Sequence, residues 1–153
     1  MAGLIYYFAF GSNMNPERVV ERGLKVKNQV GAVLHGYRLE FNKRNQRSLL
    51  TGHANVEYAP ARMVEGVLYE LSSELEILKM DPFENAPINY GREAVSLHTD
   101  VGPCWAWTYF ANPALKGNGL LPERSYMAHL LKGKPYISQD YFSYLENHEV
   151  LEA

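Results

Sequence analysis

The sequence has almost no cysteine and no long apolar run. Cys104 is the single cysteine among 153 residues, so no internal disulfide can form. This excludes a small secreted scaffold held by disulfides and favours a reducing compartment. No apolar stretch approaches the ~20 residues of a membrane-spanning helix, and the N-terminus lacks the positive region and cleavage site of a signal peptide. We therefore expect a cytoplasmic protein with no membrane attachment.

An excess of one charge is also missing. Fifteen Lys and Arg residues face seventeen Asp and Glu residues, the net charge is -2 and the pI is near 6.2. Such a balance gives no electrostatic reason for nucleic-acid binding. The sequence contains neither GxGxxG nor GxxxxGK[ST], and no His or Cys spacing indicates a metal site. We expect no nucleic-acid partner, no metal and no cofactor.

What the chain does have is a large apolar fraction, 46%, which is sufficient for one packed core. We predict a single domain over residues 1–153. Alternating or β-branched segments predict strands at 4–10, 29–42, 54–60, 62–71, 90–99 and 104–112, with loops at 43–53 and 81–89. The predicted class is α+β, a small and mostly antiparallel β-barrel flanked by a few short helices.

Four helices are expected from their start and stop signals. Asn15 and Pro16 start the first, which Gly23 ends. Ser73 with Glu76 fits a capping box for the second, which ends before Pro82. The third spans 124–133, and the fourth spans 138–151 with Ser138 as its N-cap.

The stretch "YYFAFGSNMNPER" (6–18) raises a functional question, because a buried strand ends in a small polar loop directly before a helix. Backbone N–H groups in such a loop form an anion pocket. Gly11 permits close approach of a ligand, and Ser12 and Asn13 add side-chain hydrogen bonds. An ordinary strand-to-helix turn explains the same residues. Ser12 as a nucleophile needs a neighbouring base, and no G-x-S-x-G elbow is present.

This stretch resembles the N-terminal signature of the γ-glutamylcyclotransferase family. Four further segments resemble family segments in the same order: "VEGVLYEL" (64–71), "LKMDPFENAPINYGREAV" (78–95), "CWAWTYF" (104–110) and "LPERSYMAHLLKG" (121–133) with the helix that follows. The resemblance implies the family fold and an enzyme that cleaves a γ-glutamyl-amine, such as a γ-glutamyl amino acid. The substrate's α-amine attacks its own γ-carbonyl, which gives 5-oxoproline and a free amine.

Glu84 is the residue that the resemblance implies as the catalytic general acid and base. It lies in a segment stiffened by Pro82 and Pro87, where partial burial is expected to raise its pKa. A surface glutamate is the commoner alternative by residue type. We interpret Asp81 as structural. The family often has Glu-Gly where this chain has Glu84-Asn85.

The resemblance also implies the substrate-binding residues. They are Tyr7, Phe8, Ala9, Phe10, Gly11, Ser12, Asn13, Tyr90, Tyr109 and Tyr126. Tyrosine suits such a pocket because it combines an apolar body with a hydroxyl. Phe10 departs from the family, which typically has Tyr there.

The sequence leaves the leaving amine open. We expect the segments 43–53 and 112–123 to line its pocket, and we rank intact glutathione low because members specific for it carry a different N-terminal signature. Two alternatives remain: a related cyclotransferase that acts on a specialised-metabolite amine, and a non-catalytic domain that binds an acidic metabolite. We expect a monomer or a homodimer.

Overall fold

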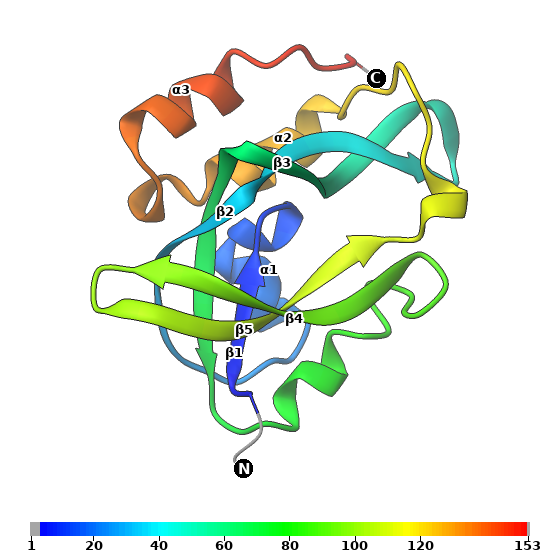
Figure 1. Cartoon of the computed structure of the whole chain (residues 1–153). Helices are drawn as coiled ribbons and strands as arrows, with labels where there is room; N and C mark the ends of the chain where they lie inside the picture. Colours follow the sequence, from blue (N-terminus) through cyan, green and yellow to red (C-terminus); the bar gives the residue numbers. More distant parts are fainter. Residues whose placement is uncertain (1–3, 153) are drawn as a thin grey trace.

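Two long strands dominate the computed structural model, which describes residues 4–152 (Figure 1). They are β2 (Val26–Asn45) and β3 (Ser48–Leu71), which pair antiparallel along most of their length. The loop predicted over 43–53 is wrong, because both strands continue to a tight turn after Asn45. The strands predicted at 54–60 and 62–71 are one strand. Pro60 is accommodated because the pairing register is interrupted there, between Tyr37↔Tyr58 and His35↔Met63.

The strands close into a barrel in the order β1-β3-β2-β4-β5. The remaining strands are β1 (Tyr6–Ala9), β4 (Tyr90–Thr99) and β5 (Gly102–Ala111). The pair β1–β5 is parallel, and the other pairs are antiparallel. The predicted β4–β5 hairpin is confirmed, with Gly102 at φ +112 in its turn. The predicted small, mostly antiparallel barrel with short helices is therefore confirmed as the fold.

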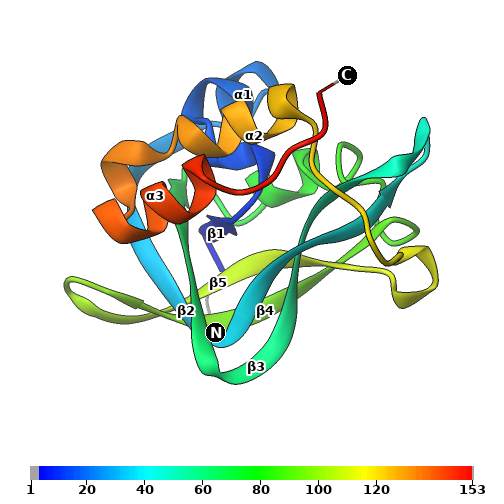
Figure 2. The same cartoon turned by 90° about the horizontal axis from the view of Figure 1, so that it is seen from above.

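Three short α-helices gather on one side of the barrel (Figure 2). They are α1 (Pro16–Glu21), α2 (Arg124–Leu131) and α3 (Gln139–Glu146). The Asn15 side chain accepts a bond from the Glu17 amide, 3.2 Å, and caps α1. Ser138 caps α3 in the same way through the Tyr141 amide. Both caps were predicted, although α3 ends five residues earlier than the expected 151.

The α-helix expected after Ser73 does not form. A single 3-10 turn, η2 (Glu76–Lys79), takes its place, and similar turns occur at η1 (Ser12–Met14), η3 (Pro113–Leu115) and η4 (Lys134–Tyr136). The capping box fails because the Glu76 carboxylate accepts bonds from the Lys25 amide, 2.8 Å, and from Lys79 Nζ, 2.9 Å. Lys25 lies directly before β2, and Lys79 lies in η2 itself.

The barrel core lies around β1, which runs through the middle of the molecule (Figure 1). Phe8, Val67, Tyr69, Leu97 and Ala106 are among its fully buried side chains. The C-terminal end of β1 leads from this core to the candidate active site. Across residues 4–152, no helix is long and apolar enough to cross a membrane.

Candidate active site

The site begins where β1 ends, because Gly11 lets two other elements approach the backbone closely. A Cβ on Gly11 would lie 3.0 Å from the Tyr126 hydroxyl and 3.1 Å from Ala54 Cβ. The chain then turns through η1 into α1. This arrangement brings β1, β3 and α2 together around one point.

A small cavity of about 40 Å³ lies at this point. Ten of the eleven predicted residues line its wall: Tyr7, Phe8, Phe10, Gly11, Ser12, Asn13, Glu84, Tyr90, Tyr109 and Tyr126. Ala54 and Thr108 complete the wall and were not predicted. Ala9 is absent from the wall, since it is buried in the core with its carbonyl against Gly66.

Glu84 is the carboxylate of this cavity, and its side chain is 17% exposed. Its Oε1 accepts a bond from Asn13 Nδ2 at 3.3 Å and lies 3.9 Å from Arg22 Nη1. Burial raises the pKa of the Glu84 carboxyl above its ordinary value, and the charges of Arg22, Arg18 and Lys43 oppose that rise. Glu84 is therefore a partly buried acid whose proton affinity exceeds that of a surface glutamate.

The turn that carries Glu84 is held by its own backbone. The amides of Phe83 and Glu84 both donate to the Met80 carbonyl, at 2.9 and 3.2 Å, and the Ala86 amide donates to the Asp81 carbonyl at 3.0 Å. Asn85 has φ +48, a left-handed conformation that glycine and asparagine adopt at low cost. Asn85 thus adopts a backbone conformation that suits the family's glycine, and this departure from the pattern does not disturb the turn.

The Asn13 side chain is engaged in hydrogen bonds within the protein. It is 2% exposed, and its Nδ2 contacts Tyr7 Oη at 2.8 Å and Glu84 Oε1 at 3.3 Å. Its Oδ1 accepts a bond from Arg22 Nη1 at 3.0 Å, and its carbonyl accepts one from Tyr69 at 2.5 Å. The side chain predicted to bind substrate therefore fixes the direction of the Glu84 carboxylate.

Two of the four predicted tyrosines have already used their hydroxyl protons. Tyr90 donates to the Ala54 carbonyl at 2.9 Å, and Tyr109 donates to Asp81 Oδ1 at 2.5 Å. Both can still accept a hydrogen bond or contact a ligand with the ring. These two side chains therefore mainly determine the shape of the cavity.

The other two tyrosines keep a proton for a ligand. Tyr126 Oη accepts from the Ala54 amide at 2.9 Å, and Tyr7 Oη accepts from Asn13. Burial raises the pKa of both phenols, so both are neutral donors at ordinary pH. Both residues line the small cavity, so each can donate its hydroxyl proton to a ligand there.

An outer cavity of about 300 Å³ shares Ser12, Glu84, Tyr90 and Tyr126 with the small one. The β2–β3 hairpin contributes Lys43, Arg47 and His53 to its wall, and α1 and its end contribute Arg18 and Arg22. Residues of the segment 43–53 line this cavity, and none of the segment 112–123 does. Burial, with Lys43 and Arg18 nearby, lowers the pKa of His53 to about 4, so His53 is neutral at pH 7.

The cations of this outer wall were not among the residues that the sequence predicted for the site. Lys43 was assigned to a loop, yet Leu39, Phe41 and Lys43 are buried at alternate positions. Continuing that period of two past Asn42 would have predicted an inward Lys43. Arg18 and Arg22 stand four residues apart, which places them on one helical face.

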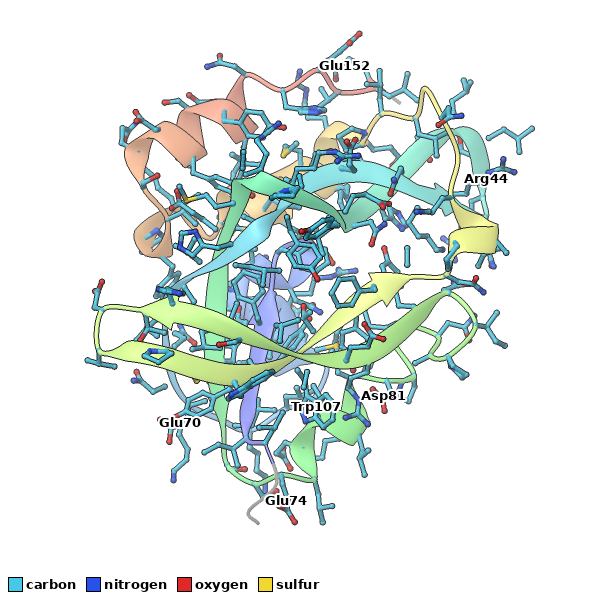
Figure 3. The ribbon with its side chains drawn as sticks, viewed as in Figure 1. Arg44, Glu70, Glu74, Asp81, Trp107 and Glu152 are labelled. Atoms are coloured by element: carbon cyan, nitrogen blue, oxygen red, sulfur yellow. The ribbon has the colours of Figure 1, made fainter. Side chains whose placement is uncertain are left out.

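Asp81 lies beside the site but outside both cavities. Arg92 Nε and Nη2 donate to its two oxygens at 2.9 and 3.2 Å. The same guanidinium lies 4.3 Å from the ring centroid of Trp107, and Figure 3 labels both Asp81 and Trp107 on this side of the barrel. These contacts agree with the structural role expected for Asp81.

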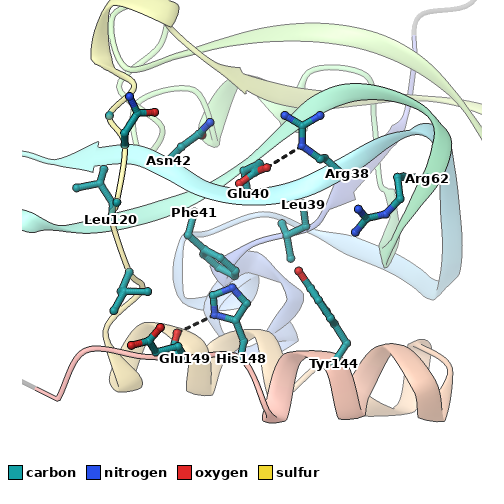
Figure 4. A pocket seen from close by; sticks show the side chains of 14 residues that line it. Arg38, Leu39, Glu40, Phe41, Asn42, Arg62, Leu120, Tyr144, His148 and Glu149 are labelled. Carbon is teal, nitrogen blue, oxygen red and sulfur yellow. Dashed lines mark hydrogen bonds and ion pairs between the residues drawn. The ribbon is translucent and has the colours of Figure 1, made fainter.

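A larger groove of about 560 Å³ lies between β2, α3 and the segment 117–121 (Figure 4). Its Glu40 pairs with Arg38 at 2.7 Å, and His148 Nδ1 contacts the Glu149 carbonyl at 2.7 Å. Its wall includes part of the segment 112–123 but none of the predicted catalytic or substrate-binding residues. Among residues 4–152 no group of three or more His, Cys, Asp and Glu side chains is arranged to hold a metal ion.

Comparisons with known proteins identify the family of this chain. A family model described as gamma-glutamyl cyclotransferase, AIG2-like, matches residues 7–128. That segment includes Glu84 and every predicted substrate-binding residue. The comparison with curated proteins gave no match.

Solved structures share the fold. An uncharacterized protein from Homo sapiens has a TM-score of 0.81 at 22% identity, over 97% of this chain and 90% of that chain. A gamma-glutamyl cyclotransferase has a TM-score of 0.81 at 21% identity, over 97% and 90%. YkqA from Bacillus subtilis has a TM-score of 0.84 at 22% identity, over 97% of this chain and 56% of that one.

Proposed function

The chain belongs to the gamma-glutamyl cyclotransferase, AIG2-like family, and from that membership we propose that it cleaves a γ-glutamyl-amine by internal cyclisation. The glutamyl α-amine attacks the γ-carbonyl carbon, a lactam C–N bond forms, and the original amide C–N bond breaks. The products are 5-oxoproline and the free amine, and no water is consumed. A γ-glutamyl amino acid is the first substrate class to test.

Positioning supplies much of the rate in such a reaction, because nucleophile and electrophile belong to one molecule. Well-oriented intramolecular reactions gain roughly 7–11 kcal/mol. The wall of the small cavity brings the β1 loop and Glu84 around one space. Walls on several sides of the ligand support the proposal, since the attacking nitrogen must be held close to the γ-carbon.

Proton transfer is the role proposed for Glu84. The α-ammonium gives a proton to the Glu84 carboxylate, the freed amine attacks, and Glu84 returns the proton to the departing nitrogen. The single observation that carries this assignment is a partly buried carboxyl with raised pKa in the wall shared with Gly11, Ser12 and Asn13. General acid–base catalysis is most effective when the pKa of the group lies near the working pH.

Charge also develops on the γ-carbonyl oxygen as the amine attacks. Tyr7 and Tyr126 line the small cavity, and each hydroxyl oxygen accepts a hydrogen bond and retains its own proton. Donors fixed in advance stabilise such an oxygen without reorganisation. We assign these two phenols to the γ-carbonyl or the glutamyl carboxylate.

The test is a panel of γ-glutamyl conjugates with 5-oxoproline quantified by mass spectrometry. The panel contains γ-glutamyl amino acids, γ-glutamyl polyamines, a γ-glutamyl aminoglycoside and glutathione. Lactam from at least one conjugate, at a rate above the uncatalysed control, supports the proposal. If no conjugate yields lactam while one binds, the chain is a non-catalytic binding domain and the proposal fails.

A further inference from the structure

The wall of the outer cavity contains a buried lysine that forms no ion pair among the described residues. Lys43 is 3% exposed, and among residues 4–152 no carboxylate lies within ion-pair distance of its Nζ. The ring of Tyr90 lies close by, with its centroid 5.7 Å from Nζ. Tyr90 lines both cavities, and Lys43 lines the outer one. The ammonium therefore belongs to the wall of the outer cavity.

Arg18 shows the same lack of a partner. Its Nε is buried and has no hydrogen-bond partner in the described part of the chain. Like Lys43, Arg18 lines the outer cavity and takes part in none of the ion pairs found among residues 4–152. Buried donors in native proteins are almost always satisfied. The unsatisfied Arg18 Nε and the unpaired Lys43 ammonium lie in one wall, and together they indicate that a ligand supplies the acceptor.

The outer cavity has more cationic than anionic side chains in its wall. Four cationic side chains line the outer cavity, namely Arg18, Arg22, Lys43 and Arg47, against the single carboxylate of Glu84. Glu84 is already engaged by Asn13 and lies nearest to Arg22, at 3.9 Å. An anion entering this cavity therefore meets a positive field, and a cation meets repulsion.

We propose that the outer cavity binds an anionic group carried by the leaving amine, with Lys43 and Arg18 as its partners. This inference rests on the proposed function, in which the glutamyl group occupies the small cavity. The substrate is then a γ-glutamyl conjugate of an amine that bears a carboxylate or a phosphate. Polyamines and aminoglycosides, which bring further positive charge, are poor substrates.

Matched conjugates test this directly. γ-Glutamyl-alanine differs from γ-glutamyl-alaninamide only in one carboxylate, and γ-glutamyl-phosphoethanolamine differs from γ-glutamyl-ethanolamine only in one phosphate. All four keep the glutamyl α-carboxylate, so its contribution cancels within each pair. We expect kcat/KM for 5-oxoproline release to favour the anionic member of at least one pair by 10-fold or more, and the preferred pair identifies the anion.

Variants assign the preference to the wall. Lys43→Met keeps the length of the side chain without its charge, and Lys27→Met removes a charge from an exposed position of the same strand. We expect Lys43→Met to reduce the preference to less than 3-fold by slowing the anionic conjugate alone, and Lys27→Met to retain it. Equal rates within both pairs for the wild type, or an undiminished preference in Lys43→Met, overturns the inference.

A binding measurement separates this inference from the proposed function. In the Glu84→Gln background, calorimetry compares the affinities of the same four conjugates with and without Lys43→Met. Tighter binding of an anionic member that depends on Lys43 supports the anion site even if the wild type releases no 5-oxoproline, in which case the proposed function alone fails. Equal affinities, or no binding by any conjugate, overturns the anion site.

Discussion

Asp81 and Glu84 lie three residues apart on one turn, yet their carboxylates differ in the hydrogen bonds that they accept. Asp81 accepts three hydrogen bonds, two from Arg92 at 2.9 and 3.2 Å and one from Tyr109 at 2.5 Å. Glu84 accepts one long bond, 3.3 Å, from Asn13. Asp81 is thus committed to the structure of the turn, and Glu84 remains available for proton exchange inside the cavity.

Replacing Glu84 by Gln removes the proposed proton carrier with little change of shape. We expect kcat for 5-oxoproline release to fall by ~10²–10⁴, the usual contribution of general acid–base catalysis, while KM changes little. Glu93→Gln, an exposed position on β4, is the matched control and is expected to retain wild-type kcat. Wild-type turnover in Glu84→Gln contradicts the assignment of the base.

The pH profile of kcat/KM reports the ionisation of Glu84 in the free enzyme. Burial raises the pKa of this carboxyl above 4.5 and Arg22 opposes the rise, so activity increases with pH through a pKa above 4.5. Arg22→Gln removes the opposing charge, and we expect the ascending limb to move to higher pH. Arg62→Gln, in the wall of the separate groove, should leave it in place. A limb that moves to lower pH in Arg22→Gln disproves the electrostatic argument.

Asp81→Asn weakens the pairing with Arg92. Hydrogen bonds to charged groups contribute about 1.5–3 kcal/mol, and we expect a loss of about 1–3 kcal/mol in the free energy of unfolding by urea. Glu40→Gln breaks the more exposed pair with Arg38 and should cost less than about 1 kcal/mol. Equal losses in the two variants contradict the structural role of Asp81.

Lys43→Met is expected to stabilise the protein while it impairs substrate selection. Burial lowers the pKa of the Lys43 ammonium below 10.5, so the folded state is penalised wherever the amine is charged, and wild-type stability recovers as pH rises toward 10.5. At pH 7 the variant should gain about 0.5–2 kcal/mol in the free energy of unfolding, against a change within about 0.5 kcal/mol for Lys27→Met. Destabilisation by Lys43→Met at pH 7 indicates that the native ammonium has a partner.

Gly66→Ala tests how β1 is held against β3. A Cβ on Gly66 would lie 2.3 Å from the Ala9 carbonyl oxygen and 2.9 Å from the Phe8 ring. The Ala9 backbone cannot move away easily because β1 is paired on both sides, so we expect a loss of about 1–3 kcal/mol in the free energy of unfolding. Gly91→Ala makes the same change in β4, where a Cβ meets nothing within 4 Å, and should be neutral or slightly stabilising. The comparison fails if the two variants unfold alike.

Local signals in the sequence were sufficient for the starts of α1 and α3. Asn15 before Pro16, and Ser138 before the last helix, cap helices as predicted because a cap depends on neighbours in the chain. The capping box at Ser73 was wrong because the Glu76 carboxylate is bonded to Lys25, 51 residues away along the chain. Local pattern therefore fails where a distant partner competes for the same group.

The sequence by itself determined the barrel class, the β1 loop and the presence of Glu84 in an ordered turn, because alternation, glycine and proline act over a few residues. Only the tertiary structure decided which carboxylate is paired and which cations are not. Those outcomes depend on Arg92 reaching Asp81 from β4, and on a strand that continues past Asn42 and turns Lys43 inward. The charge and the burial of a side chain at a site depend on residues from segments far apart in the chain. Closure of the barrel brings these segments together.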